Sequence, residues 1–257
     1  IMTKASGGVE IPASEYTYKI VDAQTGGTEV IPTYAGTYYI QVTANANSTN
    51  YTGTNTKKTF EVKAAAASIT DNGTTTYYSS LSAAYTAATA GQTVKLEADE
   101  SRNSALTITK NFTLDLNGHK ITRSSNGPVI QVANSSTTEV EFAIINSVST
   151  AGTISGTTRG VNTLNDAKLT IGSGVTIKAS DTSDGRALQV QGSSDVTING
   201  ATLESATYGI VAIGSSNVTI TSGTLTAPSI AIQNSSTGTV TVAGGSIGSS
   251  TNSNTGI

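Results

Sequence analysis

The sequence predicts an all-β protein, in which a small N-terminal antiparallel β-sandwich-like module precedes a right-handed parallel β-helix of about seven turns with a capping α-helix. Three observations predict this fold. Apolar residues alternate at period two up to about residue 63, the period changes to about 3.6 near residue 80, and from residue 94 onward apolar residues recur in register. Two domains are therefore expected, over residues 1–65 and 66–257.

The N-terminal module is predicted from three short stretches in which every second residue is apolar. Turn-forming compositions separate them, at Gly26-Gly27, at Ala35-Gly36 and in the polar run 45–50. Six of the ten tyrosines fall in this module, and most of them are expected to be buried in a thin core. The alternating apolar residues are Tyr16, Tyr18, Ile20, Tyr38, Ile40, Val42, Phe60 and Val62.

One amphipathic α-helix is predicted near residues 80–90. Ser79 or Ser80 is suited to cap its first turn, and Gly91 is suited to end it in a left-handed conformation. Because the first turn of a solenoid has an open apolar end, this helix is expected to cover it. The residues that share its apolar face are Leu81, Ala84, Tyr85 and Ala88.

The C-terminal part of the chain repeats every 22 residues. Val196, Val218 and Val240 each begin a similar apolar-Thr-apolar triplet at this spacing. A unit this short cannot bury its own apolar residues, so successive units must stack and share a core, which indicates a parallel β-solenoid. Two further apolar columns keep the same step, namely Leu203, Leu225 and Ile247, and Leu188, Ile210 and Ile232.

Earlier repeats are less regular. The run LDLNG at residues 114–118 matches VTING at residues 196–200 position for position, and its Asn-Gly pair is expected at a tight corner. Right-handed winding is the expectation for parallel crossovers. The seven expected turns begin at Val94, Leu114, Val140, Leu169, Val196, Val218 and Val240.

The composition excludes several classes of protein. The chain has no Cys, which rules out disulfides and thiolate chemistry, and its net charge of -3 leaves no basic footprint for nucleic acid. No apolar run is long enough to suggest membrane insertion. Only 12% of the residues are charged, whereas 45 are Thr and 32 are Ser, so the surface is expected to be hydroxylated.

The runs YSSLSAAY (78–85), GQTVKL (91–96) and FTLDLNGHKI (112–121) carry a resemblance. With them, residues 69–257 resemble the right-handed, pectate-lyase-like β-helix regions of bacterial cell-surface proteins. The runs YAGTYYIQV (34–42) and NYTG (50–53) look like the immunoglobulin-like repeats of large bacterial surface proteins. The resemblance implies an exported protein attached to the cell surface, with further domains at one or both ends of this chain.

The expected function is that of a non-catalytic extracellular module for adhesion, for glycan or host-protein binding, or for display. One alternative is a polysaccharide lyase or glycoside hydrolase on the same fold, because a fold does not settle a function. The other alternative is a purely structural stalk without a ligand. The sequence supports no assignment of catalytic residues, and no charged residue follows Glu204 in the last 53 positions.

Asp181 and Asp184 are the candidate metal ligands. Two carboxylates three residues apart before a turn can share a hard cation, so calcium is the one cofactor considered. The alternative interpretation is a solvated turn between strands, because calcium needs six or more oxygen ligands and no other donors are identified.

Two further groups of charged residues are candidates for catalysis. Asp115, His119 and Lys120 lie close in sequence, but Asp115 alternates with apolar residues and is expected to point to solvent. Glu139 and Glu141 flank an apolar residue and are expected on one face, where paired carboxylates can perform glycosidic chemistry. Ordinary surface charges are the alternative in both cases.

Outward threonine columns are predicted on the solenoid. Regular threonine rows can bind ice, although a β-branched residue also simply suits an exposed strand. Tyr208 is the one aromatic residue offered for sugar stacking. Residues 147–159 and 180–186 are expected to be insertions and the binding loops. The columns consist of Thr170, Thr197, Thr219 and Thr241, and of Thr202, Thr224 and Ser246.

Overall fold

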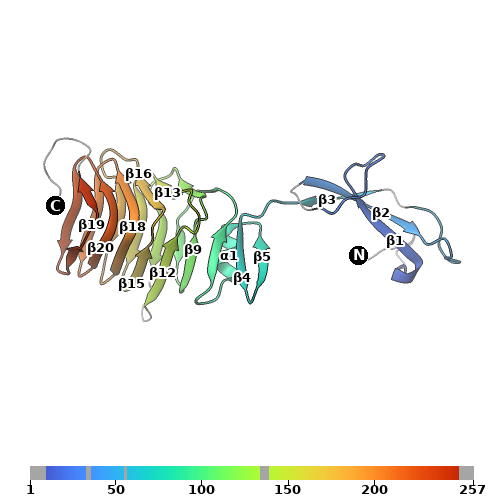
Figure 1. Ribbon diagram of the computed structural model, residues 1–257, viewed down its shortest axis with the longest axis horizontal. Coiled ribbons are helices and arrows are strands. Elements are labelled where there is room, and N and C mark those ends of the chain that lie inside the picture. Colours follow the sequence, from blue (N-terminus) through green and yellow to red (C-terminus); the bar gives the residue numbers. More distant parts are fainter. Residues whose placement is uncertain (1–9, 33–35, 55–56, 134–138, 249–257) are drawn as a thin grey trace. The chain divides into compact units, whose positions relative to one another are not determined.

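A computed structural model describes residues 10–32, 36–54, 57–133 and 139–248 (Figure 1). The chain divides into two compact units, Ile1–Ala64 and Ala65–Ile257. The first holds antiparallel strands and the second a parallel β-solenoid of seven turns, so the predicted all-β fold is confirmed. No helix among the described residues is long and apolar enough to cross a membrane.

The N-terminal unit contains one three-stranded antiparallel sheet, built from β1 (Tyr16–Val21), β2 (Gly36–Ala44) and β3 (Lys58–Val62), after the 3-10 turn η1 (Ala13–Glu15). Its strands coincide with the predicted alternating stretches. Within the described residues no second sheet packs on it, so its aromatic residues are half-buried at best, and Tyr18 is 55% exposed. The rings of Tyr38 and Phe60 stack across neighbouring strands at 5.9 Å.

The solenoid begins with a hairpin and the predicted helix. Strands β4 (Ala67–Asp71) and β5 (Thr74–Tyr78) pair with each other, and β4 also pairs antiparallel with the first strand of the solenoid. The hairpin was not predicted, although its Asn72-Gly73 turn is a strong hairpin signal. Both turn residues have positive φ, 48° at Asn72 and 78° at Gly73.

Helix α1 (Leu81–Ala87) covers the first turn, as expected. Ser80 caps it, since its Oγ accepts a hydrogen bond from the backbone N–H of Ala83 at 3.1 Å. Leu81 and Ala84 are fully buried in the core of the solenoid. The helix ends three residues earlier than predicted, because Ala88 is already extended, and Gly91 takes its positive φ of 83° in the turn that follows.

Each full turn of the solenoid contributes one strand to each of three parallel faces (Figure 1). The longer strands β18 (Asp195–Ser205) and β20 (Asn217–Thr226) run over two faces. The first face comprises β6 (Thr93–Leu96), β9 (Phe112–Asp115), β12 (Val140–Ile145), β15 (Ala167–Ile171), the first halves of β18 and β20, and β22 (Val240–Val242).

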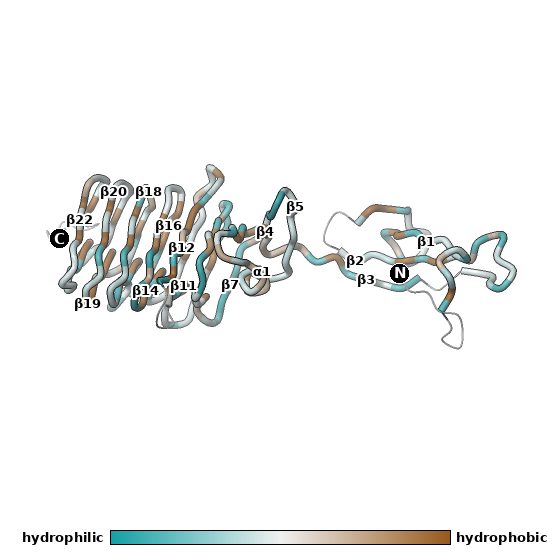
Figure 2. Tube along the Cα trace, turned by 90° about the horizontal axis from the view of Figure 1, so that it is seen from below, coloured by the Kyte–Doolittle hydropathy of each residue, from teal (hydrophilic) through white to brown (hydrophobic). Residues whose placement is uncertain are grey.

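The second face comprises β7 (Glu100–Arg102), β10 (Lys120–Arg123), β13 (Gly152–Gly156), β16 (Val175–Ala179), the second halves of β18 and β20, and β23 (Ser246–Gly248). The third face comprises β8 (Leu106–Ile108), β11 (Pro128–Ala133), β14 (Arg159–Leu164), β17 (Arg186–Val190), β19 (Tyr208–Gly214) and β21 (Ile230–Ser236). Figure 2 shows apolar and polar residues alternating along these strands, which is how each turn directs one set of side chains into the shared core.

The 22-residue columns are confirmed as inward ladders, but the earlier register is corrected. Phe112 and Phe142 occupy the position of Val196, and not Leu114 and Val140 as predicted. Leu114 aligns with Ile198 through the intervening strands. The prediction shifted because the corner from Leu114 to Ile121 is two residues longer than the corner from Ile198 to Leu203. A shift of two residues preserves which side chains face inward.

The tight corner between the first and second faces lies where the Asn-Gly and Gly-Gly pairs predicted it. Asn117 has a φ of 48°, and Gly200, Gly223 and Gly245 have φ values of 86°, 119° and 101°. At Gly223 a Cβ would lie only 2.3 Å from the carbonyl oxygen of Ala201, so this corner needs glycine for both conformation and space.

Candidate functional site

Asp181 and Asp184 lie in the turn between β16 and β17, and each has its own partner. Asp181 Oδ1 accepts hydrogen bonds from the Ser183 hydroxyl at 2.6 Å and from the backbone N–H groups of Ser183 and Asp184 at 2.8 and 3.1 Å. These bonds, the hydroxyl first, lower the pKa of Asp181 from its ordinary value. Asp184 instead pairs with Arg186 at 2.5 Å. Asp181 therefore closes the turn, and calcium binding by this pair stays a prediction.

Asp115 does not point to solvent, contrary to expectation. It is 5% exposed, and its Oδ1 accepts from the backbone N–H groups of Asn117 at 2.9 Å and Ser147 at 3.0 Å. These two bonds join its own corner to the corner of the following turn, so Asp115 ties two successive corners together. It is a structural residue in this position.

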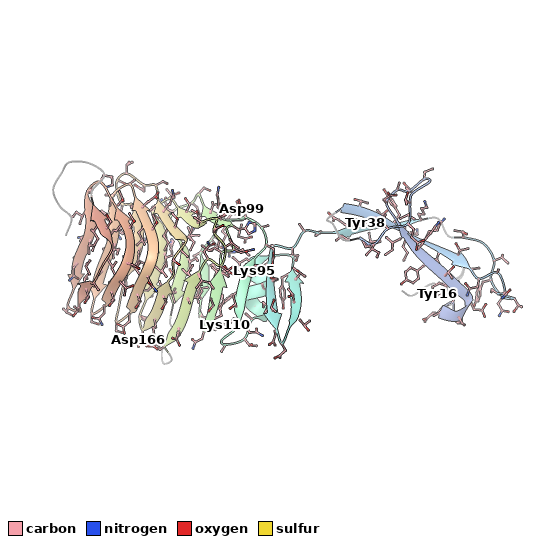
Figure 3. All side chains as sticks on the ribbon, in the orientation of Figure 1. Tyr16, Tyr38, Lys95, Asp99, Lys110 and Asp166 are labelled. Atoms are coloured by element: carbon pink, nitrogen blue, oxygen red, sulfur yellow. The ribbon has the colours of Figure 1, made fainter. Side chains whose placement is uncertain are left out.

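His119 lies near a different carboxylate. Its Nδ1 is 3.3 Å from Asp99 Oδ1, which also accepts from the backbone N–H of Lys120 at 3.0 Å. That backbone bond is the main cause of the lowered pKa of Asp99. Asp99 is an exposed residue at the edge of the solenoid (Figure 3), and the structure brings Asp115 and His119 into no shared arrangement with a nucleophile.

Glu139 and Glu141 are both exposed at the start of β12. Glu141 pairs with Lys168 of the next turn at 3.6 Å, with both side chains more than half exposed. Solvent screens such a pair strongly, so it resembles an ordinary surface ion pair. Among the residues that the structure describes, no group of three or more side chains of the metal-ligating types converges.

The threonine columns are real features of the surface. On the first face the predicted column extends back through Thr113 to Thr93, with Ala143 interrupting it. On the second face it extends back through Thr176 to Thr153. Residues 147–159 are not one continuous loop, because β13 places the five residues Gly152–Gly156 in the second face as a regular strand. The segment 180–186 is the compact turn described above.

A polar groove of about 450 Å³ lies along the second face, where its strands end and the chain turns toward the third face. Its lining contains hydroxyls, one amide and two guanidinium groups, but no carboxylate, histidine or lysine. Four successive turns contribute. The lining residues are Ser101, Arg102, Asn103, Thr122, Arg123, Ser124, Ser155, Gly156, Thr157 and Ser180.

All four arginines of the chain flank this same corner. Arg102 and Arg123 end neighbouring strands of the second face, and Arg159 and Arg186 begin neighbouring strands of the third face. Arg102 pairs with Glu100 at 2.9 Å, whereas Arg123 donates to the carbonyl oxygens of Pro128 and Asn126, both at 2.6 Å. These two guanidinium groups therefore brace the groove.

The other two arginines meet on the third face. Arg159 Nε and Arg186 Nη1 both donate to the side-chain oxygen of Gln189, the latter at 2.9 Å. Gln189 is 4% exposed, so it holds both guanidinium groups from below. Tyr208 follows Arg186 directly in the same outward column, so the aromatic residue proposed for sugar stacking lies one strand from Arg186 and two strands from Arg159.

Sequence analysis missed the groove and the arginine corner. Each arginine does stand next to a run of small turn-forming residues, and this pattern was the available signal. It could not be read without the register of all three faces, because the arginines come from both sides of the corner at irregular spacings.

No protein-family model matches the chain, and no curated protein or solved structure shows a significant match to it.

Proposed function

We propose that this chain is a non-catalytic, extracellular cell-surface module that binds glycans or host surface proteins. The observation that carries the proposal is the groove on the second face, which offers closely spaced hydroxyl donors and acceptors on a rigid support. Sugars present the complementary hydroxyls. The extracellular, cell-surface placement rests on the resemblance of residues 69–257 to surface-protein β-helices.

The lining of the groove favours binding over hydrolysis. General acid–base chemistry needs a group that gains and loses a proton near the working pH, and hydroxyls, amides and guanidinium groups do not. The carboxylates considered above lie outside this lining. A lyase or hydrolase therefore finds no pair of acid and base here, and a binding role is the better account of the groove.

The test blocks the groove with one large side chain. Ser155→Tyr fills it from the middle strand, whereas Thr153→Tyr makes the same change two residues earlier on the same strand, outside the groove lining. On arrays of glycans and matrix proteins we expect Ser155→Tyr to lose at least tenfold in affinity and Thr153→Tyr to bind as the unmodified protein does. Equal binding by both variants would remove the groove as the site, and binding to nothing would favour a stalk.

A further inference from the structure

The third face carries a site that the groove does not include. Its centre is Arg159, whose Nε is held by Gln189, while its two Nη groups have no hydrogen-bond partner among the described residues. Within the same part of the chain Arg159 also forms no ion pair. A guanidinium group fixed at one nitrogen and open at the others is prepared to donate two parallel hydrogen bonds.

The neighbouring side chains fix the geometry and leave the positive charge of Arg159 uncompensated. Arg186 lies one strand further along the same column, with its side chain only 20% exposed, and Asp184 neutralises it. The cluster of Arg159, Arg186 and Asp184 therefore keeps one net positive charge on a chain whose net charge is -3. Arg186 Nε is buried and has no hydrogen-bond partner in the described structure, so the protein leaves part of this cluster unsatisfied.

Tyr208 adds a second kind of contact. It occupies the next position of the column, two strands from Arg159, which is roughly 10 Å at the spacing of adjacent strands. An aromatic side chain presents an apolar surface with a polar hydroxyl, which suits the face of a sugar ring. Consecutive rings of one glycan can thus meet Tyr208 and Arg159.

We infer that Arg159, Arg186 and Tyr208 form a site for an oxyanion, carboxylate or sulfate, carried on a glycan chain. The oxyanion accepts paired hydrogen bonds from the Arg159 Nη groups, the Asp184-paired Arg186 lies next to it, and Tyr208 contacts a neighbouring ring. The planar guanidinium matches both oxyanions, so they share one chemistry here. The inference rests on the proposed glycan-binding function, but it concerns a different face and a different ligand class from the neutral hydroxyl groove.

Three polymers with one backbone test the site, namely dextran, carboxymethyl dextran and dextran sulfate, with affinities measured by calorimetry at two salt concentrations. We expect one or both charged polymers to bind at least tenfold more tightly than dextran, with the stronger identifying carboxylate or sulfate. Arg159→Gln is expected to remove this preference, and Tyr208→Leu to weaken it severalfold. Arg159→Lys keeps the positive charge but lacks the paired donors of a guanidinium group, so its preference for the charged polymers should be intermediate.

Lys168→Gln is the matched control, because it removes one positive charge from the exposed first face. Melting temperatures of all variants confirm folding. Equal loss in Arg159→Gln and Lys168→Gln would show non-specific attraction and overturn the inference, as would the absence of any preference for a charged polymer. Ser155→Tyr separates the two proposals: if it abolishes neutral-glycan binding while Arg159→Gln changes nothing, the groove stands and the oxyanion site fails.

Discussion

Asp115 shows how one buried carboxylate holds two corners of the solenoid. Its Oδ1 accepts two backbone N–H groups from different turns. Asp115→Ala leaves both donors unpaired in a buried place, so we expect a loss of about 1–3 kcal/mol in unfolding free energy. Chemical denaturation measures it, with the exposed Asp195→Ala as the control. An equal, small loss of unfolding free energy in both variants would show that Asp115 does not stabilise the corners.

Gly223 tests the packing of the corner. Gly223→Ala adds a Cβ at a position with a φ of 119° and 2.3 Å from a backbone oxygen, so we expect the melting temperature to fall by several degrees. Gly172→Ala is the comparison, because the nearest atom to its added Cβ is at 3.5 Å, an ordinary contact. If the two variants have the same melting temperature, the corner is not close-packed.

The ionisation of Asp181 determines how the stability of the folded protein should change with pH. Its pKa is lowered from 3.8 in the folded state, chiefly by the Ser183 hydroxyl, so the stability it contributes is present above pH 3.8 and is lost as pH falls through the folded pKa. Asp181→Asn should therefore melt lower than the unmodified protein at neutral pH and approach it in stronger acid. A difference that stays constant with pH would show that ionisation of Asp181 does not stabilise the turn.

At the scale of elements, α1 and the β4–β5 hairpin close one end of a stack whose neighbouring turns support one another. The ring of Tyr85 on α1 lies 5.3 Å from Phe112, which lies 4.9 Å from Phe142 in the following turn. Turns of a solenoid contact only their neighbours, so damage at one end should remain partly local.

Leu81→Ala, at a fully buried helix position, is the corresponding prediction. We expect it to cost about 2–5 kcal/mol and to raise hydrogen exchange most in β6 and β9, less in β18 and β20. Val148→Ala, at a residue 42% exposed, should leave exchange unchanged. A uniform rise over all turns would mean that the solenoid unfolds as a single cooperative unit.

The elements also show how far sequence could predict this protein. Turns five to seven followed from Val196, Val218 and Val240 because their corners have equal length, whereas the longer corner after Leu114 shifted the earlier register by two residues. For the site, Tyr208 and the threonine columns were recognised singly. Their neighbours were not, because only the stacking of turns brings Arg159 beside Arg186 and Tyr208.

At the scale of the whole solenoid, parallel strands fix surface side chains at a regular spacing of about 4.8 Å along the stack. Hydroxyls and two arginines are thereby gathered in the groove, and the carboxylates of Glu100 and Asp184 pair with arginines at the same corner. In Figure 3 Asp99 lies at one edge, and Lys110 and Asp166 lie at the opposite edge. Contacts for recognition can be spread over such a surface, whereas catalysis requires an acid and a base that converge.

The most direct measurement exposes the protein to an array of glycans and matrix proteins, with and without calcium, and analyses each captured glycan for cleavage by mass spectrometry. We expect binding in which every captured glycan keeps its length. Shortened products that disappear in Glu141→Ala or Asp184→Ala would contradict a non-catalytic role and identify an enzyme.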